Sequence, residues 1–257
     1  MARRKLGQHF LAKGSILERI ARAACPQPVD AVIEIGPGRG ALTAKLLERA
    51  SRVIAIEVDP ALAAHLRAKF AGEPRLEVVE ADVLATDLVQ WGRLPVAGNL
   101  PYYIATPILE RTARLGVPRA VFLIQKEVAE RLVASPGTRS YGFLTVEIGL
   151  FASARLLFEV KPGAFHPPPK VDSAVVLLEP RSTLAAIDNP EDFLRFVSLC
   201  FRHKRKTLRN NLAGAYPKEA LDKLPEAGLR AEQIPMEGFV AMYERLGVSA
   251  DPPSPRR

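Results

Sequence analysis

The chain has 257 residues, of which 48% are hydrophobic, and this suits one large domain, or a large domain with a small appendage, around a substantial core. No apolar run approaches the roughly 20 residues of a membrane helix. No signal-peptide stretch follows the basic N-terminal residues, so a cytoplasmic protein without membrane contact is expected. The formal net charge of +8 favours polyanionic partners such as nucleic acid.

Between about residues 30 and 125, apolar segments typical of strands alternate with segments of helical periodicity. The expected strands are residues 31–35, 52–57, 76–80, 94–97 and 119–124. The expected helices between them are residues 41–49, 60–70 and 106–114. Such alternation predicts an α/β fold with a parallel sheet covered by helices on both faces.

The second half of the chain changes character. A helix is expected at 143–151, followed by a late strand pair at 152–160 and 173–179 that flanks the proline-rich loop 161–171. Beyond residue 181 only short amphipathic helices are expected, at 191–201, 204–212, 218–224 and 236–246. The sequence therefore predicts an α/β domain at 1–181, a small all-α domain at 182–250 and a disordered tail at 251–257.

A glycine-rich turn, Glu34-Ile35-Gly36-Pro37-Gly38-Arg39-Gly40, joins the first strand to the first helix. It fits either a dinucleotide or S-adenosylmethionine, and Glu57, 21 residues past Gly36, can bind a ribose in both cases. Two acids favour S-adenosylmethionine. Glu34 suits a cationic ligand, and Asp82 after the third strand can accept a hydrogen bond from an adenine amino group.

The segment Asn99-Leu100-Pro101-Tyr102 follows another apolar strand. It offers an amide oxygen, a backbone carbonyl made rigid by proline, and a flat ring, which together suit a planar exocyclic amine such as adenine N6. Strand ends meet at one edge of a parallel sheet, so Gly36, Glu57, Asp82 and Asn99 are expected to lie together. This pattern predicts an amino-methyltransferase acting on a nucleobase. Because the sulfonium donor is already activated, no metal is expected.

Basic residues gather in two places that are expected to contact RNA phosphates rather than bases. One is the N-terminal arm with Arg3, Arg4 and Lys5. The other is predicted to be a helix, and it carries Arg202, Lys204, Arg205, Lys206 and Arg209.

Ordered motifs from Leu6 to about Leu246 make the chain resemble the ribosomal RNA adenine-N6 dimethyltransferases, most closely the branch acting on 16S rRNA. The matching segments are GQHFL at 7–11, EIGPG at 34–38, AIEVD at 55–59, NLPYYI at 99–104, QKEVAER at 125–131, FHPPPKVDS at 165–173 and RKTLRNNL at 205–212. One departure is His9, where asparagine is frequent.

The resemblance implies a Rossmann-like class I methyltransferase sheet and S-adenosylmethionine as cofactor. It also implies N6,N6-dimethylation of adenosines in a loop near the 3′ end of 16S rRNA, within the immature small ribosomal subunit. Implied cofactor contacts come from His9, Leu11, Gly36, Glu57, Asp82 and Asn99.

The expected mechanism needs no general base. Asn99 and the Leu100 carbonyl would accept hydrogen bonds from N6 and make its lone pair available. Tyr102 is the expected stacking face, and Phe165 the opposite face, for an extruded adenine.

Three other functions are compatible with parts of this pattern. A 23S rRNA dimethyltransferase keeps the chemistry and changes the RNA. A ribosome-assembly factor would chiefly bind the immature subunit, and a nicotinamide-dependent oxidoreductase is permitted by the glycine turn alone. The even scatter of charge and the absence of a long apolar stripe favour a monomer.

Overall fold

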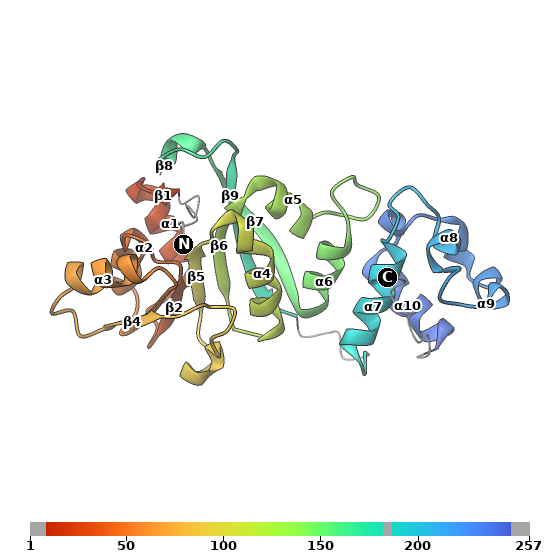
Figure 1. Ribbon diagram of the computed structural model, residues 1–257, viewed down its shortest axis with the longest axis horizontal. Coiled ribbons are helices and arrows are strands. Elements are labelled where there is room, and N and C mark those ends of the chain that lie inside the picture. The colour runs from red at the N-terminus through yellow and green to blue at the C-terminus, as the bar shows by residue number, and fades with distance from the viewer. Residues whose placement is uncertain (1–8, 182–186, 248–257) are drawn as a thin grey trace, which may run out of the picture. The chain divides into compact units, whose positions relative to one another are not determined.

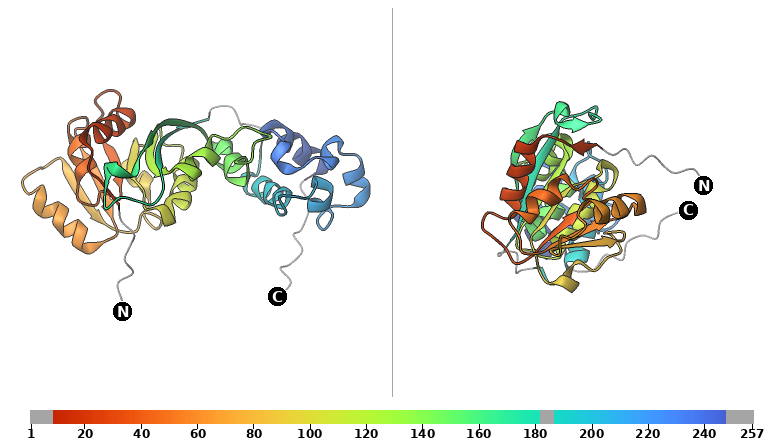
Figure 2. Two further views of the ribbon diagram at one scale, coloured as in Figure 1. Left: turned by 90° about the horizontal axis from the view of Figure 1, so that it is seen from above. Right: turned by 90° about the vertical axis from the view of Figure 1, so that its left-hand side faces the viewer.

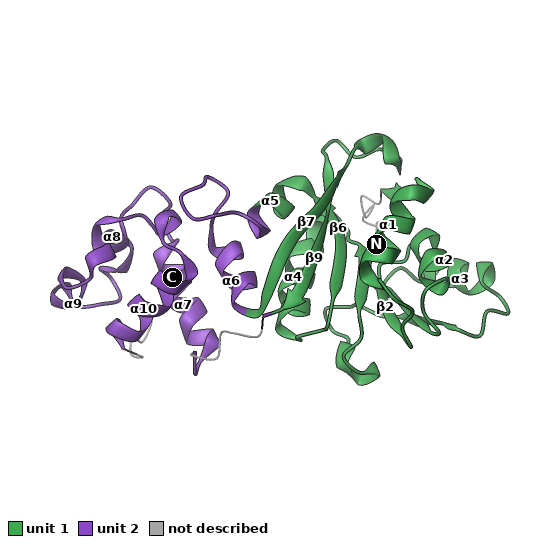
Figure 3. Cartoon of the chain, turned by 180° about the vertical axis from the view of Figure 1, so that it is seen from behind, with its two compact units in different colours: residues 1–130, 151–180 green, residues 131–150, 181–257 purple. Residues whose placement is uncertain are grey.

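The computed structural model describes residues 9–181 and 187–247. The chain forms two compact units (Figure 3). Unit 1 comprises residues 1–130 and 151–180, and unit 2 comprises residues 131–150 and 181–257.

Unit 1 is built on a seven-stranded sheet with the order β4-β3-β2-β5-β6-β9-β7 (Figure 1). Its strands are β2 (Val32–Ile35), β3 (Val53–Glu57), β4 (Leu76–Glu80), β5 (Val96–Asn99), β6 (Ala120–Gln125), β7 (Ala152–Val160) and β9 (Ser173–Pro180). The first five run parallel, whereas β9 pairs antiparallel with both β6 and β7. The expected mostly parallel sheet with a late antiparallel pair is confirmed.

Helices cover the sheet on both faces (Figure 2). Every residue of β2 and β3 is buried, as expected for central parallel strands that are packed on both sides. The helices of this unit are α1 (Gly14–Ala24), α2 (Ala41–Leu47), α3 (Pro60–Lys69) and α4 (Ala105–Arg114), and α5 (Lys126–Leu132) begins in it. The predicted helices at 41–49, 60–70 and 106–114 correspond to α2, α3 and α4.

Two parts of unit 1 are additional to the expected elements. Helix α1 buries Leu17, Ile20, Ala21 and Ala24 on one face, with the spacing of an amphipathic helix. The two-residue strand β1 (Phe10–Leu11) pairs antiparallel with β8 (Phe165–His166), which lies in the proline-rich loop. Single 3-10 turns complete the unit: η1 (Leu88–Trp91), η2 (Tyr102–Ile104) and η3 (Pro162–Ala164).

Unit 2 is helical and has an aromatic core. Its helices are α6 (Phe143–Phe151), α7 (Pro190–Cys200), α8 (Leu208–Leu212), α9 (Lys218–Asp222) and α10 (Met236–Leu246), with 3-10 turns η4 (Pro225–Gly228) and η5 (Ala231–Gln233). Phe193, Phe196 and Tyr243 pack ring against ring between α7 and α10.

Residues 131–150, which the sequence places in the large domain, belong to unit 2. The Arg181 guanidinium donates to the Gly149 carbonyl at 3.0 Å, and the Tyr141 ring lies 6.2 Å from that of Phe201. The Gly137 N–H donates to the Glu232 carbonyl at 2.7 Å. These contacts join two segments that are distant in sequence. The expected tail at 251–257 lies outside the described residues.

The predicted helix at 204–212 is wrong in its first half, because α8 begins only at Leu208. Asn211 provides the physical reason. Its side-chain oxygen accepts the His203 N–H at 3.1 Å, and its amide donates to the Cys200 carbonyl at 2.7 Å. The preceding basic residues are thereby held in turns. In the part of the chain that the structure describes, no helix is long and apolar enough to cross a membrane.

Candidate functional site

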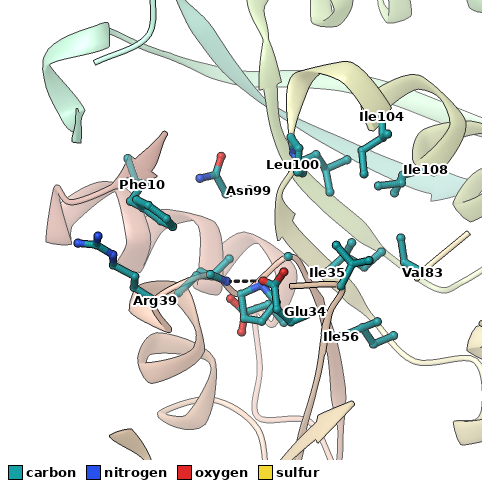
Figure 4. A pocket seen from close by; sticks show the side chains of 18 of the residues that line it. Phe10, Glu34, Ile35, Arg39, Ile56, Val83, Asn99, Leu100, Ile104 and Ile108 are labelled. Atoms are coloured by element: carbon teal, nitrogen blue, oxygen red, sulfur yellow. Dashed lines mark hydrogen bonds between the residues drawn. The ribbon is translucent and has the colours of Figure 1, made fainter. Parts of the chain in front are cut away.

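A cavity opens in unit 1 where the carboxyl ends of β2, β3 and β5 meet the segment after β4 (Figure 4). Because these four strands are neighbours in the sheet, their ends bring together residues from four separate parts of the sequence. Most of the predicted site residues line the cavity: His9, Leu11, Gly36, Glu57, Asp82, Asn99, Leu100, Pro101 and Tyr102. Phe10 and Arg39 lie on one side, and Ile56, Val83 and Ile108 form an apolar wall on the other (Figure 4).

The glycine turn takes its shape from left-handed backbone at Gly36, Gly38 and Gly40, whose φ angles are +67°, +55° and +75°. The Glu57 carboxylate, at the end of β3, accepts the Gly38 N–H at 3.0 Å through Oε2 and the Asp59 N–H at 3.0 Å through Oε1. This carboxylate is therefore fixed in place. Each of its oxygens keeps a second lone pair, which can accept a ligand hydroxyl.

Glu34, the acid within β2, has a different environment. It is 1% exposed, and its Oε2 atom has no hydrogen-bond partner among the described residues. Burial raises the pKa of Glu34 to about 8, with a smaller increase from the nearby Glu57 charge, while Thr43 and Lys69 oppose the shift. A buried acid with an unsatisfied oxygen at a cavity wall suits a cationic ligand group.

Strand β1 closes one side of the cavity. The Phe10 ring lies so close to the glycine turn that a Cβ atom on Gly38 would meet it at 3.0 Å. The Arg39 guanidinium lies over the same ring, 4.7 Å from its centroid. His9 Nδ1 is 2.9 Å from the Pro167 carbonyl, so the segment is also anchored to the proline-rich loop.

Asn99 is oriented by this segment, because its amide nitrogen donates to the His9 carbonyl at 3.0 Å. That contact leaves the amide oxygen available as an acceptor, which is the atom that a bound amine would need. Tyr102 is half-buried and also lines the cavity, with its ring 5.9 Å from that of His9. Burial raises the pKa of Tyr102, so its hydroxyl stays protonated at neutral pH.

Phe165 differs from the expected arrangement. Its side chain is 5% exposed and packs in the hydrophobic cluster with Leu11, Leu17 and Val160, and it is not among the residues that line the cavity. Pairing of Leu11 with Phe165 between β1 and β8 turns the ring into the core. A stacking role for this ring stays a prediction that would require it to leave the core.

The basic residues of unit 2 form an exposed loop at 202–206, before α8. Lys204 Nζ donates to the Arg139 carbonyl at 2.8 Å, which brings an exposed arginine of the loop before α6 beside this cluster. Arg209 instead forms an ion pair with Asp222 on α9. Sequence analysis missed Arg139, because only the tertiary fold brings residues 139 and 204 together. The predicted contacts of Arg3, Arg4 and Lys5 lie outside the described residues.

The mostly parallel sheet, the glycine turn at β2 and the Asn-Leu-Pro-Tyr segment after β5 define a Rossmann-like methyltransferase. Residues 1–246 match the family described as Ribosomal RNA adenine dimethylase. The chain belongs to this family, and it is a methyltransferase that uses S-adenosylmethionine.

Named relatives support the assignment. The chain is 40% identical to Ribosomal RNA small subunit methyltransferase A of Thermosynechococcus vestitus, covering 95% of this chain and 97% of the relative. It is 41% identical to the protein of the same name from Acinetobacter baylyi, covering 95% and 92%.

Two solved structures are similar over nearly the whole chain. A dimethyladenosine transferase from Plasmodium falciparum has a TM-score of 0.77 and 29% identity, covering 91% of this chain and 96% of that one. The 23S rRNA methyltransferase ErmE has a TM-score of 0.72 and 31% identity, covering 92% and 99%. Within the described residues, no group of three or more His, Cys, Asp and Glu could hold a metal ion.

Proposed function

We propose that this protein transfers methyl groups from S-adenosylmethionine to N6 of adenosines in the RNA of the small ribosomal subunit, twice on each nitrogen. The observation that carries the proposal is the orientation of Asn99, whose amide nitrogen is engaged by the His9 carbonyl at the edge of the cofactor cavity. The names of the relatives at about 40% identity support the choice of RNA.

The cavity offers a partner for each part of the cofactor. Glu57 would accept from the ribose hydroxyls, and Asp82 from the adenine amine beside the apolar wall. Glu34 and the segment of His9 and Leu11 would surround the cationic methionine end. The bound cofactor supplies a methyl group already activated on a sulfonium.

The remaining chemistry concerns the acceptor nitrogen, whose lone pair is delocalised into the adenine ring. Hydrogen bonds from N6–H to the Asn99 side-chain oxygen and the Leu100 carbonyl would favour a more tetrahedral nitrogen and stabilise its developing positive charge. Tyr102 would stack on the extruded base. An amide cannot act as a base near neutral pH, so the proton is lost to solvent after transfer.

We further propose that the target is a loop near the 3′ end of 16S rRNA in an immature subunit, recognised by a monomer. Sequence-specific RNA recognition usually needs unstacked bases. The exposed cations Arg202, Lys204, Arg205, Lys206 and Arg139 of unit 2 would hold phosphates around it.

A radiolabel experiment tests the choice of RNA, for which the 31% identity to a 23S rRNA methyltransferase offers an alternative. The protein is incubated with labelled S-adenosylmethionine and either small subunits that lack the modification or 23S transcripts. Label in dimethyladenosine from the small subunit is expected. Label only in 23S RNA would overturn the choice of substrate, and tight subunit binding without any transfer would favour the assembly-factor function.

A further inference from the structure

Tyr102 lies on a short stretch of backbone between Pro101 and helix α4. It begins η2, a single 3-10 turn in which the Ile104 N–H donates to the Pro101 carbonyl at 3.1 Å. A turn of this length cannot by itself fix the direction of an aromatic side chain. The ring nevertheless has a defined place in the cavity wall, so other contacts must hold it.

The hydroxyl of Tyr102 lies 2.7 Å from the hydroxyl of Ser173, which is 71 residues further along the chain. Ser173 is fully buried, and no other hydrogen bond of its side chain occurs among the described residues. The hydrogen bond between the two hydroxyls therefore satisfies the buried Ser173 side chain and the Tyr102 hydroxyl together.

Ser173 itself is a firm anchor. As the first residue of β9 it pairs with Gln125 on β6 and with Val160 on β7, so strands flank it on both sides. The preceding residue, Asp172, accepts the Lys126 N–H at 3.0 Å and forms an ion pair with Lys161 at 2.5 Å. The Ser173 oxygen thus has a position set by the sheet and not by the loop that carries Tyr102.

A second contact limits the ring from the side of β1. The His9 ring is 5.9 Å from the Tyr102 ring with an angle of 31° between the planes. His9 is in turn anchored to the Pro167 carbonyl at 2.9 Å. The tyrosine is therefore tethered at its hydroxyl and bounded at its ring by two segments that meet only in the folded protein.

We propose that Ser173 is a positioning residue that sets the plane of Tyr102 for stacking against the acceptor adenine. This inference rests on the proposed function, in which Tyr102 stacks on the extruded base. Ser173 does not line the cavity, so it would act on the RNA substrate only through the tyrosine hydroxyl. Binding of S-adenosylmethionine should be unaffected by its loss.

Four variants test the proposal with unmethylated small subunits as substrate: Ser173→Ala, Tyr102→Phe, the double variant and Tyr102→Ala. Methyl transfer is measured against subunit concentration at saturating S-adenosylmethionine, and cofactor affinity is measured by calorimetry. Ser173→Ala and Tyr102→Phe should each lower kcat/KM for the subunit about tenfold, the value of one hydrogen bond. The double variant should lose no more than either single variant, and cofactor affinity should stay within about twofold.

Several results would overturn the proposal. Multiplicative losses in the double variant would show that the two hydroxyls act independently. Full activity of Tyr102→Phe would show that the tyrosine hydroxyl does not contribute, and this variant remains informative if Ser173→Ala does not fold. A control is Ser153→Ala, which removes an exposed hydroxyl of β7 that donates to the Glu179 carbonyl of β9 at 3.3 Å. This variant should leave kcat/KM unchanged.

The Ser173 role and the proposed function would fail on different results. Wild-type rates of methyl transfer by Tyr102→Ala would contradict both the stacking role of Tyr102 and the positioning role of Ser173. A strong loss in Tyr102→Ala together with full activity of Ser173→Ala and Tyr102→Phe would overturn the Ser173 role alone. Failure of the wild-type protein to methylate small subunits would contradict the proposed function.

Discussion

At the scale of single residues, two acids on neighbouring strands are held in different ways. Both oxygens of Glu57 accept backbone N–H groups, which fix the carboxylate in place. Glu34 is buried, one of its oxygens has no hydrogen-bond partner in the described parts of the chain, and burial disfavours its charged form. The same part of the cavity thus provides a fixed acceptor for hydroxyl groups and an acid whose charged form a cationic ligand would stabilise.

The state of Glu34 predicts a pH effect on stability. Its pKa is about 8 in the folded protein against an ordinary value of 4.5, so between these values the folded state holds the proton more tightly. The free energy of unfolding should therefore fall as pH rises from about 4.5 to 8, by up to about 1 kcal/mol for each pH unit. Urea denaturation at several pH values should show this slope reduced in Glu34→Gln. Identical slopes in the two proteins would contradict the assignment.

The position of Phe165 predicts a loss of stability. Because the ring is buried beside Leu11 and Leu17, Phe165→Ala should lower the free energy of unfolding by about 3 kcal/mol. Phe165→Leu, which keeps most of the apolar volume, should retain most of both stability and methyl transfer. A variant Phe165→Ala that is fully stable but inactive would instead support the stacking role expected from the sequence.

At the scale of elements, β1 matters because its side chains and backbone reach both the glycine turn and the proline-rich loop. Gly38 has a left-handed backbone conformation and lies against the Phe10 ring. An alanine at this position would strain the backbone, and its methyl group would collide with the ring. Closure of the cavity by this strand therefore depends on Gly38.

We predict that Gly38→Ala weakens binding of S-adenosylmethionine about tenfold and destabilises the fold by about 1–2 kcal/mol. Calorimetric titration and thermal unfolding would measure the two effects. Gly14→Ala is the matched control, because a Cβ atom there meets nothing within 4 Å. It should leave binding unchanged and stabilise α1 slightly. Equal affinities for Gly38→Ala and wild type would refute the closing role of β1.

The regular alternation of strands and helices between residues 30 and 125 could be predicted from the sequence, but helix α1 was missed despite its amphipathic spacing. Strand β3 appears where expected, whereas β5 (Val96–Asn99) begins two residues later than the expected strand 94–97. Strand β1 has two residues and is defined only by its partner, so no local pattern identifies it. The prediction that a helix begins at residue 204 was wrong, because the Asn211 side chain holds the preceding residues in turns. Hydrophobic periodicity does not reveal such contacts.

The candidate site also contains residues that could be predicted from the sequence and partners that could not. Gly36, Glu57, Asp82 and Asn99 were predictable because parallel strand ends meet at one edge. The partners that orient them were not predictable, since they come from segments that only the tertiary fold brings close. The His9 carbonyl beside Asn99, Ser173 beside Tyr102 and Arg139 beside Lys204 are three examples.

At the scale of the whole molecule, the positive charge is not equally available for RNA. Arg205 and Lys206 are exposed, with no ion pair among the described residues, whereas Arg209 is paired with Asp222. A cation that is already neutralised releases fewer counterions when it meets a phosphate. The cations of unit 2 should therefore contribute unequally to binding.

Salt titrations of subunit binding test this inequality. Arg205→Ala should weaken binding and reduce the slope of log K against log salt by about 0.7–0.9. Arg139→Ala should behave similarly, and Arg209→Ala should change the slope by less. Equal slope changes for Arg205→Ala and Arg209→Ala would show that the Asp222 pair does not limit the contribution of Arg209.

The most direct test of the Asn99 role is the nucleoside composition of small-subunit RNA after reaction with wild-type protein and with Asn99→Ala. Mass spectrometry should find N6,N6-dimethyladenosine with the wild type, and a rate about 100-fold lower for the variant, since the acceptor for the N6 hydrogen is lost. S-adenosylmethionine binding and thermal unfolding would be measured in parallel. Dimethyladenosine formed at the wild-type rate by a folded Asn99→Ala variant would contradict the proposed role of this site.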